Sequence, residues 1–259
     1  MKLGCFGSSK DLVSIKKAGY DCAELDFCEI TDMPDTQFTT FYKECTGSGL
    51  GFEVFSGLLP LTERFFSKDF SLDFWLEHTE KGARRVSELG CNMIPFGAGK
   101  CRSIPESVSL QNGSSHIAGI ITAFSNLLGN YHIQLVIEPL GPANSNFLNT
   151  LPEVHNFLPS VKSQNCSSLC DLRHMHKTGE SLENIITYHS IIKHAHIDFP
   201  RGDLRYFPDP TDEYPYADYI DKLKESNYDR ILTVEATAVK KEFFTEAKVC
   251  CEYLQLLLN

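Results

Sequence analysis

The sequence contains no run of apolar residues long enough to cross a bilayer, and its first ten residues, MKLGCFGSSK, hold no continuous apolar stretch. We therefore expect no membrane span, no signal peptide and no lipoprotein leader. Positive charge is also scarce, because lysine and arginine total 24 against 34 acidic residues, for a net charge of −10. That balance argues against non-specific binding to nucleic acid or anionic membranes. These absences predict a cytoplasmic protein that binds neither nucleic acid nor membrane.

No Cys-x-x-Cys pair occurs among the ten cysteines, so the chain offers no structural zinc site of the usual spacing. Several cysteines lie in apolar, strand-like runs, where a free thiol behaves as a small hydrophobic side chain. Disulfides are rare in reducing compartments. We therefore expect the cysteines to be free thiols.

Nucleotide-binding motifs are missing as well. No Gly-x-Gly-x-x-Gly follows the first strand-like run, and no P-loop occurs. This weakens the case for a doubly wound open sheet, which is the main alternative to the fold we favour.

The chain does contain a repeated alternation of short β-like runs with longer helical patterns, for example over 71–90 and 114–132. Strands that alternate with helices imply βαβ units and a parallel sheet. Eight such units predict an α/β fold of the (β/α)8 or TIM barrel type, as a single domain over 1–259. The strands are expected at 2–6, 21–27, 51–57, 91–97, 133–139, 167–173, 192–198 and 230–236.

Ionisable residues stand at the ends of the last four predicted strands. They are Glu138 in VIEPL, Asp171 in LCDLR, His196 in KHAHID and Glu235 in LTVEA. In barrel enzymes the catalytic groups sit at this end of the strands, so the four side chains should meet at one rim. Several carboxylates in one small mouth repel one another unless a cation binds. The pattern therefore predicts a site for one divalent metal ion.

The residue types suggest which ion. Three carboxylates and one imidazole are mostly hard oxygen ligands, which favour Mn²⁺, with Mg²⁺ or Co²⁺ as alternatives and Zn²⁺ less suited.

The run KHAHID alternates polar and apolar side chains. In a strand His194, His196 and Asp198 share one face, and we expect that face to point into the protein. His196 is then a metal ligand. His194 lies one pleat deeper and is expected in the core or behind the ligands, while Asp198 at the mouth is a candidate to orient a ligand or bind substrate.

These motifs resemble the xylose isomerase-like barrel superfamily, which includes sugar isomerases and epimerases and the AP endonucleases. The resemblance covers most of the chain and is carried by FGAGKCRSIPES, VIEPLGPANSNFLNT, LCDLRHMHKTGE, KHAHIDFPRG and YDRILTVEA. It implies an enzyme that binds a small sugar or sugar derivative, and it allows a homo-oligomer.

By the resemblance to ketose 3-epimerases and hydroxypyruvate isomerases, Glu138, Asp171, His196 and Glu235 correspond to metal ligands. Glu138 and Glu235 also correspond to the acid/base pair that moves a proton beside a carbonyl through an enediolate. His174 and Arg201 correspond to residues that hold substrate oxygens. Epimerases of this type commonly have a glutamate six residues after the first ligand, where this chain has Asn144, so a substrate contact is expected to differ.

Two loops leave alternatives open. The segment 200–216 carries both Arg201 and Arg205, so either could be the substrate arginine, and together they could contact a phosphate or carboxylate. The loop FGAGKCRSIPE carries Gly97, Gly99 and Arg102 and could cradle an anion, although its glycine spacing is a weak signal.

Other functions compete with a sugar isomerase or epimerase. A lyase or deglycosylase acting on an oxidised sugar would use the same site residues. A non-catalytic sugar-binding barrel is a further alternative, because fold does not fix function. AP endonuclease activity is disfavoured, because the loops EVFSGLLP, IPFGAGKCR and FPRGDLRYF lack the further histidines of a three-zinc cluster.

Overall fold

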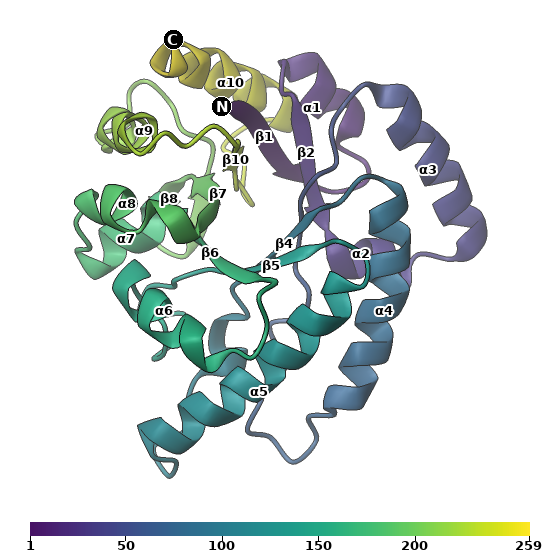
Figure 1. The fold of residues 1–259 in the computed structure, drawn as a ribbon. Helices are drawn as coiled ribbons and strands as arrows, with labels where there is room; N and C mark the ends of the chain where they lie inside the picture. The colour runs from purple at the N-terminus through teal and green to yellow at the C-terminus, as the bar shows by residue number, and fades with distance from the viewer.

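The computed structural model describes residues 1–259, and its eight long-range strands form a parallel barrel in the order β3-β2-β1-β10-β7-β6-β5-β4. Helices surround the strands on the outside (Figure 1). The predicted (β/α)8 barrel is thereby confirmed. The barrel strands are β1 (Lys2–Gly7), β2 (Cys22–Asp26), β3 (Phe55–Ser56), β4 (Met93–Phe96), β5 (Gln134–Ile137), β6 (Cys166–Asp171), β7 (Ile192–Ile197) and β10 (Ile231–Val234).

The barrel closes weakly between β3 and β4. No ladder joins these strands, and the only parallel bridge pairs Val54 with Met93. The backbone amides of Asn92 and Met93 both donate to the carbonyl of Glu53, at 2.9 and 3.2 Å. Closure therefore depends on few hydrogen bonds at this seam.

Ten helices form the outer layer, and none is long and apolar enough to span a membrane. The two helices anticipated from the sequence are α4 and α5. Helix α10 packs against α1, so the two ends of the chain lie close together (Figure 1). The helices are α1 (Leu12–Ala18), α2 (Phe27–Asp32), α3 (Asp35–Ser48), α4 (Leu72–Glu88), α5 (Leu110–Gly129), α6 (Leu151–Phe157), α7 (Leu172–Thr178), α8 (Glu183–Thr187), α9 (Tyr216–Glu225) and α10 (Phe243–Leu258).

The inside of the barrel is layered. Its floor is a separate apolar cluster with side chains from or beside six strands: Cys22, Val54, Met93, Val136, Leu169 and Ile231. Further along the strands the inward positions become polar, because side chains two residues apart share a face. On the outer face of β7, Ala195 and Ile197 are fully buried in the large core beneath the helices. The polar face of this strand therefore points inward, as expected, and all ten cysteines are free.

The segment after β7 differs from expectation. We expected a loop, but β8 (Phe199–Arg201) and β9 (Leu204–Tyr206) pair as an antiparallel hairpin. Its turn uses Gly202 with φ +64°, a conformation that favours glycine. The strands are three residues long and one contains Pro200, so neither shows the alternation that identifies a strand in sequence.

Candidate active site

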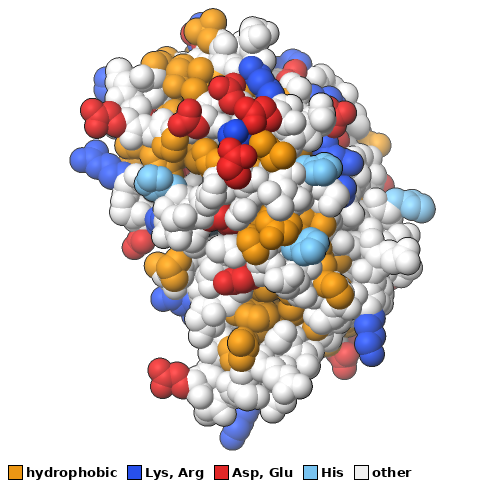
Figure 2. All heavy atoms as spheres, turned by 60° about the vertical axis from the view of Figure 1, so that its left-hand side comes forward, with side chains coloured by type: hydrophobic (Ala, Val, Ile, Leu, Met, Phe, Trp, Pro, Cys, Tyr) orange, Lys and Arg blue, Asp and Glu red, His pale blue; other side chains and the backbone are white.

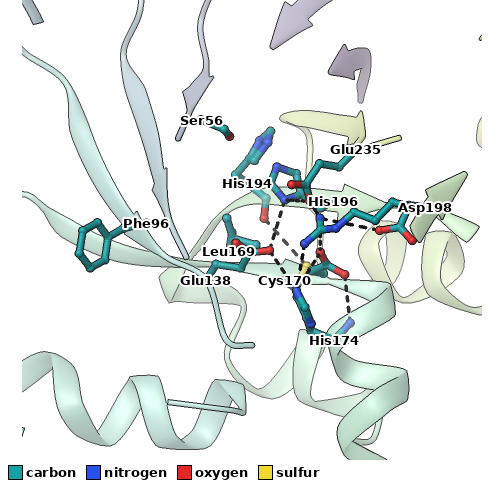
Figure 3. Close-up of polar contacts among 12 residues, drawn as sticks. Ser56, Phe96, Glu138, Leu169, Cys170, His174, His194, His196, Asp198 and Glu235 are labelled. Carbon is teal, nitrogen blue, oxygen red and sulfur yellow. Dashed lines mark hydrogen bonds and ion pairs between the residues drawn. The ribbon is translucent and has the colours of Figure 1, made fainter. Parts of the chain in front are cut away.

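Four side chains from consecutive barrel strands converge at the mouth. Glu138 directly follows β5, Asp171 ends β6, His196 lies on β7 and Glu235 directly follows β10. One ligand atom from each lies within 4.8 Å of the others. Figure 3 shows Glu138, His196 and Glu235 turned toward one another. The structure thus brings together all four residues that the sequence nominated.

The facing atoms of this group lack hydrogen-bond partners. Glu138 Oε1, Asp171 Oδ2, His196 Nδ1 and Glu235 Oε2 are all buried without one. Unsatisfied buried polar atoms are costly unless a charge or a ligand compensates them. Three carboxylate oxygens and one imidazole nitrogen suit a divalent cation of the Mn²⁺ or Mg²⁺ type. The residues present therefore fit a single metal ion.

Arg205, on β9, inserts its guanidinium among these carboxylates. It forms an ion pair with Glu235, and its Nη1 lies 3.7 Å from Asp171 Oδ2. Burial alone would lower the pKa of Arg205, but the carboxylates of Asp171 and Glu138 outweigh it and raise that pKa. Arg201 is exposed in the same hairpin and is not brought to this group.

His174 lies in the first turn of α7, beside the four residues. Its Nδ1 accepts a hydrogen bond from the Gly141 amide at 3.0 Å, which leaves Nε2 to carry the ring proton. Nε2 lies 3.6 Å from Glu138 Oε1. Burial lowers the pKa of His174. A neutral ring that presents an N–H toward the site can donate to a substrate oxygen.

Glu24 on β2 is the main residue that the sequence reasoning missed. It is 1% exposed, and its carboxylate accepts from His194 Nε2 at 3.0 Å and from His196 Nε2 at 3.1 Å. Ser56 also donates to it. A carboxylate on Nε2 fixes the tautomer of His196 and leaves Nδ1 free to bind a ligand. The available signal was an acid within the apolar run CAEL, which alternates as β7 does.

The charges of this buried group are strongly coupled. Burial alone would raise the pKa of Glu24, but His196 and His194 outweigh it, and the pKa lies well below the ordinary range. Burial alone would lower the pKa of His196, but Glu24 and Glu138 raise it to about 10. In the absence of a cation, the imidazole and Arg205 thus supply the positive charge that the carboxylates need.

Asp198 lies at the mouth, fully buried, beyond the four candidate ligand residues. Neither carboxylate oxygen has a hydrogen-bond partner, and the nearest cation is Arg205 Nη1 at 3.8 Å. Burial and the neighbouring Asp171 raise the pKa of Asp198 to about 7. Figure 3 shows its carboxylate at the edge of the cluster.

A cavity of about 490 Å³ opens above these residues. Small-molecule sites commonly have volumes of this order. Asn144, half-buried, belongs to its wall together with Glu138 and Glu235. Further wall residues come from the loop after β3, at 57–61, and from the end of β4 and the loop that follows it, at 95–99.

The loop after β4 does not cradle an anion through Arg102. That side chain is fully buried, and it donates to the backbone carbonyls of Phe96, Glu138, Phe147 and Leu148. Its role is to tie the ends of β4 and β5 to the loop that follows. Gly97 leaves room for the Glu138 side chain, because a β-carbon at position 97 would collide with Glu138 Oε2.

The face formed by α6 to α9 carries side chains of both charges. Figure 2 shows acidic, basic and apolar side chains interspersed there, without a continuous basic stripe.

Comparison with known proteins identifies the family of this chain. The model of the xylose isomerase-like TIM barrel family matches residues 12–251. No curated protein sequence matches the chain. Several solved structures resemble the whole chain at low sequence identity, so they bear on the fold alone.

A D-psicose 3-epimerase solved with D-fructose has a TM-score of 0.82 and 17% identity, covering 100% of this chain and 99% of its own. A D-psicose 3-epimerase from Clostridium cellulolyticum H10, solved with D-tagatose, has a TM-score of 0.81 and 15% identity, covering all of both chains. A 3-keto-D-glucoside 4-epimerase from E. coli has a TM-score of 0.83 and 15% identity, covering 99% of both. Since the family model spans most of the sequence and the fold agrees throughout, the chain belongs to the xylose isomerase-like TIM barrel family.

Proposed function

We propose that this protein is a metal-dependent sugar isomerase or epimerase that moves a proton on a carbon beside a carbonyl. The observation that carries the proposal is the convergence of four buried ligand atoms without a hydrogen-bond partner, on Glu138, Asp171, His196 and Glu235. The resemblance to ketose epimerases adds support for a sugar substrate.

Glu138, Asp171, His196 and Glu235 would hold the ion. We propose Mn²⁺ as the preferred ion, with Mg²⁺ or Co²⁺ as alternatives and Zn²⁺ less favoured, on the chemistry of this donor set. A bound divalent ion would act as a Lewis acid that polarises the substrate carbonyl and stabilises the negative charge that develops on its oxygen.

Glu138 and Glu235 are the proposed acid/base pair. They enter the mouth from β5 and β10, with β6 and β7 between them in the sheet. One carboxylate can remove a proton from the carbon beside the carbonyl and the other can return it to the opposite face, which inverts that centre. Return to the neighbouring carbon would instead interconvert aldose and ketose.

Substrate positioning falls to the residues around this pair. Arg205 Nη2 and His174 Nε2 lie 3.3 Å apart beside the pair, Asn144 belongs to the cavity wall, and Asp198 is buried next to Arg205. We assign the substrate arginine to Arg205, because Arg201 is exposed on the far part of the hairpin. The neutral Asn144 would give a substrate hydroxyl a weaker partner than a carboxylate would.

A lyase acting on an oxidised sugar is the second candidate. It is favoured by one similar structure, a probable 3-DHS dehydratase from Bacillus anthracis, with a TM-score of 0.79 and 16% identity. Such an enzyme removes the same kind of proton and then expels a leaving group. The two candidates differ only in the product.

The first test combines metal analysis with isotope exchange. We expect about one Mn²⁺, Mg²⁺ or Co²⁺ per chain by elemental analysis, and deuterium uptake from D₂O into ketoses by NMR. Glu138→Gln and Glu235→Gln should each lower exchange by at least about 100-fold, because general acid–base groups contribute on that order. Glu88→Gln, at an exposed position of α4, is the matched control.

Full exchange in either site variant would rule out the proton-transfer assignment. Failure of the protein to bind any divalent ion on titration would shift the weight to a non-catalytic sugar-binding barrel. Release of water or another leaving group from the substrate would identify the lyase.

A further inference from the structure

Arg173 is a buried arginine in the wall of the active-site cavity. It stands in the first turn of α7, next to His174, and is 3% exposed. It lines the cavity together with Glu138, Arg205 and Glu235. No part of the proposed proton transfer uses it.

Its hydrogen-bonding capacity is mostly unused. Nη2 donates to the backbone carbonyl of Asp203 at 3.2 Å, and the buried Nε has no partner. No carboxylate lies within 4 Å of the guanidinium. A buried charge without a contacting counter-charge is costly, so a position of this kind favours a bound anion.

The other deeply buried arginines provide a contrast. Arg85 pairs with Asp35 and donates to three backbone carbonyls. Arg102 donates to four carbonyls. Both are satisfied by the fold itself, whereas Arg173 is not.

The surroundings of Arg173 carry charges of both signs, but none of the acids pairs with it. Burial and the nearby Arg173 lower the pKa of Lys177, which forms no ion pair of its own. Two acids face the group. Asp198 lies within 4 Å of Arg205 but not of Arg173, and Asp203 offers Arg173 only its carbonyl. The protein therefore leaves this guanidinium without a dedicated anionic partner.

We propose that Arg173 binds a negatively charged substituent of the substrate, a phosphate or a carboxylate, that enters the cavity with the sugar. An arginine fork matches either group with two parallel N–H···O bonds. The inference rests on the proposed function in taking a sugar as the ligand. It narrows the substrate class from neutral ketoses to sugar phosphates or sugar acids.

The test measures anion binding directly. Inorganic phosphate and acetate are titrated by calorimetry into the metal-loaded wild type, Arg173→Gln, Arg173→Lys and the control Arg201→Gln, an exposed arginine of the hairpin. We expect Arg173→Gln to weaken binding of the preferred anion by about 10-fold or more, the size expected for hydrogen bonds to a charged group. Arg173→Lys should retain part of the affinity, and Arg201→Gln should change it less than about 3-fold. Preference for phosphate or for acetate identifies the substituent.

Three outcomes contradict the inference: no binding of either anion by the wild type, unchanged binding in Arg173→Gln, or equal losses in Arg201→Gln. Anion binding to the metal ion alone would be retained in Arg173→Gln and is thereby distinguished from binding by Arg173. If Arg173→Gln does not fold, the comparison of the wild type with Arg173→Lys decides.

A second arm separates this inference from the proposed function. D-fructose, D-fructose 6-phosphate and D-fructuronate differ only at one end, and each is tested for deuterium uptake in D₂O. Exchange without anion binding would leave the function standing and remove the role of Arg173. Anion binding at Arg173 without exchange into any ketose would support the role of Arg173 and contradict the proposed function.

Discussion

At the scale of single residues, Glu24 has the largest expected influence on metal binding without touching the ion. Its carboxylate holds the Nε2 atoms of both His194 and His196. We expect Glu24→Gln to weaken Mn²⁺ affinity by about 10- to 100-fold, the range seen when a carboxylate behind a ligating histidine is lost. Metal titration of the purified protein measures this.

Two further variants make the Glu24 prediction specific. Ser56→Ala removes a donor to Glu24 while leaving both histidines in place, so it should change metal affinity far less. Glu24→Asp should recover part of the affinity lost in Glu24→Gln. Equal affinity in Glu24→Gln and wild type would show that the carboxylate does not set the orientation of His196.

Gly97 is predicted to be essential for a steric reason. A methyl group there would meet Glu138 Oε2, so Gly97→Ala should displace that carboxylate. A misplacement of about 1 Å can lower turnover by about 100-fold, and we expect a loss of this order in isotope exchange. The melting temperature should fall only slightly, because the strain is local.

Gly119→Ala is the control for Gly97→Ala. It adds a methyl group at an exposed position of α5 with open space around it, and alanine favours helix. Normal exchange in Gly97→Ala would mean that Glu138 can act from a shifted position.

The sequence predicted those site residues that lie at the ends of predicted strands. Glu138, Asp171, His196 and Glu235 each end an apolar run, so their common rim followed from barrel topology. Glu24 lies in the middle of β2. An acidic residue at such a position is expected to face solvent as long as its histidine partners are unknown. Which arginine reaches the site, Arg201 or Arg205, depended on the turn of a hairpin that no periodicity marks.

At the scale of elements, the β8–β9 hairpin carries Arg205 into the mouth. Its turn residue Gly202 has φ +64°, which a β-branched side chain strongly disfavours. We expect Gly202→Val to loosen the hairpin and to raise the KM for the ketose substrate by about 5- to 30-fold, since such strain costs about 1–2 kcal/mol. Steady-state kinetics and limited proteolysis at the hairpin measure the two effects.

Asp203→Ala is the matched control at the other turn position. It keeps the backbone carbonyl that Arg173 uses and does not require a left-handed conformation. An unchanged KM in Gly202→Val would show that Arg205 does not depend on the hairpin for its position.

The element order was predictable because the eight strands are buried on both faces and read as short apolar runs. The lengths were less predictable. The third strand was expected over 51–57, but only Phe55–Ser56 pair as a strand. The difference arises at the seam, where β3 has a ladder partner in β2 only. Whether a segment pairs as a strand depends on residues that are distant in the sequence, and a local sequence pattern does not contain that information.

At the scale of the whole molecule, the seam between β3 and β4 should be the first part of the barrel to open. The amides of Asn92 and Met93 share a single acceptor, whereas β6 and β7 are joined by a four-pair ladder with one register shift between Ser168 and Leu169. We expect the two seam amides to exchange with solvent faster than the amides of β6 and β7, as local openings follow weak hydrogen bonding. Hydrogen exchange followed by mass spectrometry or NMR measures this.

Added Mn²⁺ provides the control for the seam. The proposed ligand residues lie on or directly after β5, β6, β7 and β10, so the ion should slow exchange in those strands more than at the seam. Slower exchange at the seam than in β6 and β7, without added ion, would contradict the expected order of opening.

The position of β10 between β1 and β7 has a consequence for synthesis of the chain. While a ribosome is still adding residues before Ile231, the sheet consists of two pieces, β3-β2-β1 and β7-β6-β5-β4, which meet only at the weak seam between β3 and β4. Glu24 and Glu138 then sit on separate pieces, and Glu235 has not yet been made. The last strand therefore delivers the fourth proposed ligand and joins the two pieces by a ladder on each of its sides, so a nascent chain cannot present the complete set of proposed ligands before its barrel can close.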